Sequence, residues 1–163
     1  MKTCQLFESA LETVELLKKH NLKISTAESC TGGMVASFIT SVSGVSDVFE
    51  MGITSYSCRI KNEILGVKKD TLDKFGAISE ETARQMAENI RQISCSDIGV
   101  SVTGVAGPSS SEGHPMGYVF IALSDSEKTI VNLLNIEPIS REFVRETVVL
   151  ELFEFIRNYI KGK

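Results

Sequence analysis

The chain has 163 residues, of which 42% are apolar, and its formal net charge is −4. This length fits one globular domain over residues 1–163, and the apolar fraction excludes a chain that is disordered throughout. The acidic balance argues against a broad surface for nucleic acid or anionic membranes. The four cysteines are far apart in the sequence and form no CxxC pair, so neither a zinc site nor a disulfide scaffold is expected.

The sequence shows no targeting or membrane-spanning pattern. No apolar run approaches the roughly 18 residues that a transmembrane helix requires. The first 20 residues contain Glu8, Glu12 and Glu15, which interrupt any hydrophobic region of a signal peptide. We therefore expect a cytoplasmic protein.

The first half of the chain alternates between helical and extended patterns. Apolar residues follow the period of an amphipathic helix over 3–20, at Phe7, Leu11, Val14 and Leu17. The elements expected after it are a strand at 22–26, a turn at 27–33, a helix to about residue 40, a strand at 49–56 and a short helix at 61–65 that Gly66 ends.

The second half continues this alternation. Ser79 is the expected N-cap of a helix with an apolar side formed by Ala83, Met86, Ala87, Ile90 and Ile93. Strands are expected at 98–105, 117–124 and 129–136. Ser140 should cap a last helix with an apolar side formed by Val144, Val148, Leu152, Phe155 and Tyr159. The pattern predicts an α/β layered fold, in which sites gather where strands end and helices begin.

The first candidate site is the turn at 28–33. Backbone N–H groups at a helix start can bind an anion or an oxyanion, and Gly32 and Gly33 would let a ligand approach closely. Ser29 would be presented on this turn as a nucleophile. The alternative is that Ser29 or Thr31 only caps the helix. The pattern is neither GxGxxG nor a P-loop, so a nucleoside triphosphate site is not indicated.

The second candidate is Lys61, because a serine nucleophile needs a base. The chain has only two histidines, and neither lies in an obvious turn after a strand. Burial would help Lys61 to lose its proton, since desolvation disfavours the ammonium. Tyr56 could orient this lysine or relay a proton. The alternative is that Lys61 is a solvated lysine of a surface helix.

The third candidate is the turn at 103–108, where Gly104 and Gly107 end an expected strand. Small residues there would let a ligand pass close to the backbone. The alternative is an ordinary tight turn.

The fourth candidate is the pair Arg141 and Arg145, which share one face of the last helix. Positive charge near a helix start opposes the helix dipole, and this placement suits a bound anion such as a phosphate. The alternative is that Glu142 and Glu146 neutralise both arginines in surface pairs.

Taken together, these motifs resemble the CinA C-terminal domain family, whose characterised members are nicotinamide-nucleotide amidases. Residues 26–33 are similar to the family signature, and residues 103–108 to a second long block. Shorter blocks are matched in family order by Tyr56-Ser57 with Lys61, by Leu65-Gly66-Val67, by residues 76–81, by Pro115 and Gly117, and by Arg141 and Arg145. The resemblance covers residues 5–160.

The resemblance implies a three-layer α/β/α sandwich around a mixed central sheet, with no cofactor and no metal. It also implies hydrolysis of the carboxamide of nicotinamide mononucleotide to nicotinic acid mononucleotide and ammonia, which recycles pyridine nucleotides. The expected partners are this small-molecule substrate and further copies of the chain in a homo-oligomer, with neither nucleic acid nor a membrane. The alternative is a catalytically silent paralogue that binds a nucleotide or a partner protein.

The resemblance also implies a role for each candidate residue. Ser29 would be the nucleophile, Lys61 the base that takes its proton and later protonates the leaving ammonia, and Tyr56 would assist that relay. The oxyanion donors would be backbone amides near Cys30 and Thr31 or the Thr103 hydroxyl. Arg145, with Arg141, would take the ribose phosphate. The pocket would be shaped by Gly32, Gly33, Gly104 and Gly107.

The sequence departs from the family pattern beside these motifs. Cys58 stands where the family usually has asparagine, and Ser140 where aspartate is frequent. Ser110 and Ser111 occupy a region of paired glycines. The following residues, His114-Pro115-Met116-Gly117-Tyr118, replace the usual Lys-Pro-Val-Gly-Thr.

Overall fold

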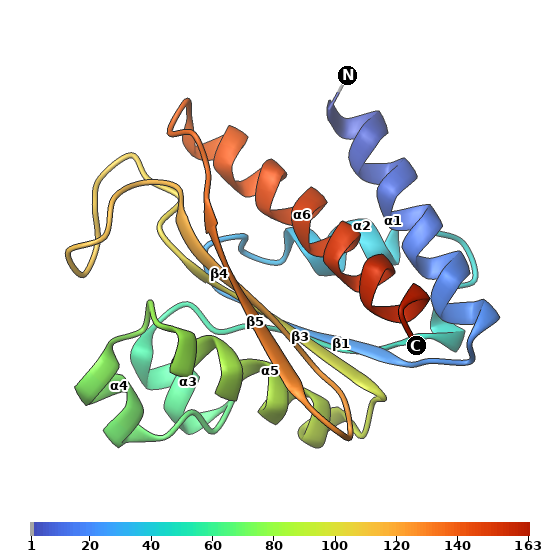
Figure 1. Ribbon diagram of the computed structural model, residues 1–163, viewed down its shortest axis with the longest axis horizontal. Helices are drawn as coiled ribbons and strands as arrows, with labels where there is room; N and C mark the ends of the chain where they lie inside the picture. Colours follow the sequence, from blue (N-terminus) through green and yellow to red (C-terminus); the bar gives the residue numbers. More distant parts are fainter. Residues whose placement is uncertain (1) are drawn as a thin grey trace.

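The computed structural model describes residues 2–163, which form a five-stranded sheet with helices on both faces (Figure 1). The helices are α1 (Lys2–Lys19), α2 (Met34–Thr40), α3 (Cys58–Glu63), α4 (Lys69–Phe75), α5 (Glu80–Ser94) and α6 (Arg141–Lys161), with a short 3-10 helix at Val45–Asp47. The strands are β1 (Ile24–Glu28), β2 (Phe49–Thr54), β3 (Ile98–Gly104), β4 (Tyr118–Ser124) and β5 (Thr129–Asn135).

The sheet is mixed, with the strand order β2-β1-β3-β4-β5. β1 pairs in parallel with β2 and β3, and Glu28 lies opposite both Thr54 and Val102. The pairs β3–β4 and β4–β5 are antiparallel. After β1 the chain turns toward β2, and after β3 it turns the other way toward β4. Such a reversal opens a crevice beyond the carboxyl ends of the two strands, where α/β proteins bind ligands.

The helices form two layers, one on each face of the sheet, as the family resemblance implies. Helices α1, α2 and α6 cover one face of the sheet, and α3, α4 and α5 lie against the other (Figure 1). The largest apolar core fills the first interface, where Leu17 of α1 and Leu152 of α6 are buried in one cluster with Val100 of β3. Met86 and Ile90 of α5 bury the other face against Ala27. None of the described helices is long and apolar enough to cross a membrane.

The apolar sides of three helices differ in part from the predictions. In α1 the buried side is Leu6, Ala10, Val14 and Leu17, whereas Phe7 is exposed. Ile93, in the last turn of α5, is also exposed. In α6 the buried set adds Val149, Phe153, Ile156 and Ile160, while Phe155 and Tyr159 are only half-buried. A helix advances about 100° per residue, so a stripe placed one residue away faces a different side.

The predicted caps are confirmed, whereas one helix was missed. The side chains of Ser79 and Ser140 accept hydrogen bonds from the backbone N–H of Thr82 and Phe143. Helix α3 starts three residues earlier than predicted, because Ser57 caps it by accepting from the N–H of Ile60. Helix α4 was not predicted. Its seven residues, KDTLDKF, carry too few apolar positions to show a helical period.

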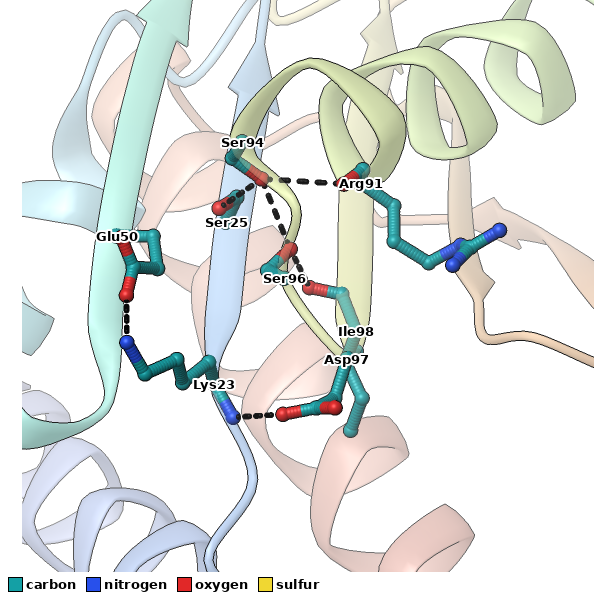
Figure 2. Close-up of polar contacts among 8 residues, drawn as sticks. All are labelled: Lys23, Ser25, Glu50, Arg91, Ser94, Ser96, Asp97 and Ile98. Carbon is teal, nitrogen blue, oxygen red and sulfur yellow. Dashed lines mark hydrogen bonds and ion pairs between the residues drawn. The ribbon is translucent and has the colours of Figure 1, made fainter.

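A network of serines ties the end of α5 to the end of the sheet where β1 and β3 begin (Figure 2). The Ser25 hydroxyl donates to Ser94 Oγ at 2.7 Å, and Ser94 Oγ lies 2.9 Å from Ser96 Oγ. The backbone N–H of Lys23 donates to the Asp97 carboxylate at 2.7 Å, and the Lys23 ammonium pairs with Glu50. These contacts connect the starts of β1 and β3 to each other, to Glu50 of β2 and to the end of α5.

Gly99→Ala should destabilise the fold, because α5 passes directly over this strand residue. A Cβ at position 99 would lie 2.2 Å from the Ala87 carbonyl oxygen, which is a backbone atom of α5. Moving the helix away should cost about 2–3 kcal/mol of unfolding free energy, measured by denaturant unfolding. Gly162→Ala is the matched control, since its Cβ would have ordinary space at 3.4 Å. Equal stability of both variants would contradict this view of the α5 contact.

Candidate active site

A cavity of about 280 Å³ lies beyond the carboxyl ends of β1 and β3. Eight of the residues expected at the site line it, namely Ser29, Cys30, Tyr56, Lys61, Thr103, Gly104, Gly107 and Arg141. Four others do not line it, namely Thr31, Gly32, Gly33 and Arg145. Further lining residues come from the 77–78 turn and the loop between β3 and β4. The cavity therefore brings together the turns at 28–33 and 103–108 and Lys61 of α3.

Ser29 and Lys61 form a direct contact at the bottom of this cavity. Lys61 Nζ lies 2.9 Å from Ser29 Oγ, although the two residues are 32 positions apart. Ser29 is 8% exposed and Lys61 only 1% exposed. Lys61 is therefore not a solvated surface lysine, and that alternative was wrong.

The surroundings of Lys61 disfavour its charged form. Burial lowers the pKa of the amine from its ordinary value of 10.5, while weaker effects of nearby thiols and of Glu112 raise it. Nζ also lies 2.6 Å from the Ser55 carbonyl oxygen and 3.4 Å from that of Tyr56. A neutral amine has two N–H groups for these two carbonyls, which leaves its lone pair for the Ser29 hydroxyl proton.

The Tyr56 side chain contacts Arg141 and not Lys61, which it was expected to orient. Its ring is 64% exposed, and its hydroxyl accepts a hydrogen bond from Arg141 at 3.3 Å. Within the described residues this hydroxyl makes no hydrogen bond to Ser29 or Lys61, and only the backbone carbonyl of Tyr56 lies near the Lys61 amine. A direct proton relay through the Tyr56 hydroxyl therefore lacks a geometric basis here.

Glu28 is a site residue that the sequence analysis missed. Its carboxylate is buried under the start of α2 and accepts from the N–H groups of Gly33, Val35 and Ala36 at 2.9–3.1 Å. The N-terminal amides of α2 are thus occupied, and neither Ser29 nor Thr31 caps the helix. The expectation that the amides at the start of α2 bind an anionic ligand was therefore wrong. A carboxylate directly before a Gly-Gly turn is the signal that could have indicated a cap.

Cys30 supplies a backbone donor directly after the nucleophile. Its N–H makes no hydrogen bond to another described residue, and Cys30 lines the cavity. An amide one residue after a nucleophile is a common oxyanion donor. The thiol itself is unreactive, because burial raises its pKa to about 12. The Thr103 hydroxyl donates to the Ala77 carbonyl at 2.7 Å, so its hydrogen is not available to an oxyanion.

The two arginines of α6 are placed differently. Arg141 lines the cavity, where it donates to the Gly107 carbonyl and to the Tyr56 hydroxyl. Arg145 lies outside the lining and donates to the Thr31 carbonyl at 2.7 Å, which supports the turn that carries Ser29. Of the pair, Arg141 is the one placed to meet an anionic ligand in the cavity.

The glycines that were expected to shape the pocket act in different ways. Gly32 and Gly33 adopt positive φ angles of 63° and 92° in the turn behind Ser29. At Gly104 a Cβ would lie 2.5 Å from Val119 Cα, so this glycine allows close pairing with β4. Gly107 has a φ of 85°, and its Cβ would meet the Met116 sulfur at 2.3 Å.

Glu112, in the loop between β3 and β4, is a second lining residue that was missed. Its carboxylate accepts from the N–H groups of Ala77 and Ile78 at 3.2 and 3.0 Å. The sequence offered one signal, since Glu112 is the sole Asp, Glu, Lys or Arg between positions 104 and 117. Within residues 2–163, no three His, Cys, Asp or Glu side chains cluster closely enough to hold a metal ion.

Comparison with known proteins agrees with the fold and the motifs. The family model of the CinA C-terminal domain matches residues 7–160. A CinA-like protein from Kosmotoga olearia is 48% identical over 154 residues, which are 93% of this chain and 37% of that protein. A relative from Caldanaerobacter subterraneus is 45% identical over 92% of this chain and 36% of its own length. The chain thus spans little more than a third of the curated relatives it matches.

Solved structures show the same architecture. The competence/damage inducible protein CihA from Agrobacterium tumefaciens superposes with a TM-score of 0.89 at 34% identity, over 94% of each chain. A competence or damage-inducible protein from Enterobacter asburiae gives 0.91 at 28% identity, over 95% of this chain and 98% of the other. With a family model that matches nearly its whole length, the chain belongs to the CinA C-terminal domain family.

Proposed function

We propose that this protein hydrolyses the carboxamide of nicotinamide mononucleotide, with Ser29 as nucleophile and Lys61 as base. The observation that carries the proposal is the 2.9 Å contact between Ser29 Oγ and a buried lysine amine with a lowered pKa. A buried amine with a lowered pKa beside a serine is an arrangement suited to acyl transfer. The resemblance to amidases of the CinA C-terminal domain family supplies the substrate.

In this mechanism, Lys61 takes the Ser29 proton as Oγ attacks the carboxamide carbon. The carbonyl oxygen becomes an oxyanion, which the Cys30 N–H would stabilise; such donors typically contribute about 3–4 kcal/mol. Lys61 then gives the proton to the nitrogen, the C–N bond breaks and ammonia leaves an ester on Ser29. Water attacks this ester with Lys61 again as base, which releases nicotinic acid mononucleotide and restores the serine.

Arg141 would hold the ribose phosphate in the same cavity. Its guanidinium is fixed by the Gly107 carbonyl and the Tyr56 hydroxyl, and it still has N–H donors for phosphate oxygens. Arg145 would act indirectly, through the Thr31 carbonyl that it binds.

The test is ammonia release from nicotinamide mononucleotide by the purified protein and by Ser29→Ala. We expect turnover in the first and its loss in the second, because an alanine offers no nucleophile. Folding of the variant is checked by thermal unfolding. A folded wild-type protein without turnover would contradict the proposal, and retained binding of the nucleotide would then indicate a binding protein.

A further inference from the structure

The cavity has side-chain charges of opposite sign on two separate walls. Its lining contains three side chains of the Lys, Arg, Asp and Glu types, which are Lys61, Glu112 and Arg141. Glu112 is bound to the turn before α5, on one side of the sheet, whereas Arg141 begins α6 on the other (Figure 1). Lys61 comes from α3, on the same side of the sheet as α5, and its amine contacts Ser29. A ligand that fills the cavity would therefore meet an anion at one wall and a cation at the other.

The local backbone fixes the Glu112 carboxylate at its wall. Ser111 and His114 exchange both backbone hydrogen bonds, at 3.1 and 2.9 Å, around a two-residue turn. Glu112 and Gly113 occupy its centre with φ angles of 51° and 79°. Such a turn favours asparagine or glycine, so a glutamate there is held in an unfavourable backbone region. Strain of this kind is a reason to look for a function of the side chain.

Two further contacts keep this loop in place. The carboxylate bridges the N–H groups of Ala77 and Ile78, and the His114 ring stacks on Tyr118 with centroids 4.3 Å apart. Although Glu112 is exposed, its charge reaches the reaction centre, because it contributes to raising the pKa of Lys61 against the larger effect of burial.

On the basis of the proposed amidase function, we propose that Glu112 selects a cationic pyridinium carboxamide over an uncharged amide. The reacting amide must lie at Ser29, so the ring that carries it lies within the same small cavity as Glu112. A ring nitrogen that bears a sugar is permanently positive, and the carboxylate attracts it at all pH values where Glu112 is ionised. With Arg141 on the opposite wall, the site then matches a substrate that is positive at the ring and negative at the phosphate.

Two substrates that differ by one hydride on the ring, and therefore in ring charge, provide the test. Nicotinamide mononucleotide has a cationic ring, whereas its 1,4-dihydro form carries the same amide and phosphate on a neutral ring. For Glu112→Gln we expect kcat/KM to fall about tenfold with the first substrate and less than twofold with the second. Each value is compared with wild type on the same substrate, which cancels the different reactivity of the two amides. The tenfold loss should shrink as salt is added.

Glu127→Gln is the matched control, because it removes the same charge from the turn between β4 and β5, at the far end of the sheet. It should leave both substrates unaffected. An equal loss on both substrates in Glu112→Gln would mean that the carboxylate only fastens the loop, and this would overturn the proposal, as would no loss at all.

A binding measurement separates this proposal from the amidase proposal. Calorimetry with Ser29→Ala and with Ser29→Ala/Glu112→Gln gives the affinity for both nucleotide forms without turnover. A preference for the cationic form that disappears with Glu112 supports the selection, even if wild type proves to release no ammonia. Equal preferences in both variants overturn it, even if the amidase activity is confirmed.

Discussion

Lys61→Met should lower kcat/KM for nicotinamide mononucleotide about 10³-fold, because it removes the general base but keeps most of the length of the side chain. Lys61 Nζ is the hydrogen-bond partner of Ser29 Oγ among the described residues, and the Tyr56 hydroxyl pairs with Arg141 instead. Without the amine, the serine must attack as a neutral hydroxyl. The measurement is steady-state ammonia release, with circular dichroism to show that the variant is folded.

Lys69→Met is the control for this variant, since Lys69 is an exposed lysine whose amine pairs with Asp73 on α4. It should keep wild-type turnover. If Lys61→Met retained more than a tenth of the activity, Lys61 would not be the base, and the role of the pair with Ser29 would have to be structural.

The lowered pKa of Lys61 also predicts how activity and stability depend on pH. The base must be neutral, so kcat/KM should rise with pH through a pKa below 10.5, the ordinary value of lysine. The unfolded chain binds more protons than the folded one between the lowered pKa and 10.5. The unfolding free energy of the wild-type protein should therefore increase with pH across that window. Lys61→Met should lack this increase. Denaturant unfolding of both proteins at several pH values measures the difference.

The sequence predicted the elements that carry the site because their signals are local. Ser79 and Ser140 cap helices with their own side chains, and a run of apolar residues is enough to indicate β3. The turn with Ser29 was found because strand, glycines and helix adjoin each other in sequence. Lys61 could be proposed only because a serine needs a base, since its burial depends on packing that no local pattern shows.

The parts that sequence analysis missed or misplaced depend on contacts between distant segments. Glu112 meets Ala77 across 35 positions, and Arg145 meets Thr31 across 114. Neither partner can be read from spacing along the chain. Phe7 was misplaced for a related reason, because the exact side of α1 that faces the sheet is set by its packing with α6.

Glu28→Ala should lower the free energy of unfolding by about 3 kcal/mol, the largest loss that we expect from a single polar side chain in this chain. The substitution leaves three backbone N–H groups at the start of α2 without their acceptor. These groups are partly or fully buried, so water cannot fully replace the carboxylate. Denaturant unfolding measures the loss.

Hydrogen exchange shows whether this loss arises at the turn or from a general loosening. If the carboxylate holds α2, the amides of Gly33, Val35 and Ala36 should exchange much faster in Glu28→Ala, while those of α5 should change only as much as the global stability does. Glu28→Gln keeps one acceptor oxygen, so its stability should lie between that of wild type and that of Glu28→Ala.

Because the turn behind Ser29 is held by the same carboxylate, turnover should follow this order, with wild type fastest and Glu28→Ala slowest. A variant that keeps its stability within about 0.5 kcal/mol would instead mean that the turn is held by Gly32, Gly33 and Arg145 alone.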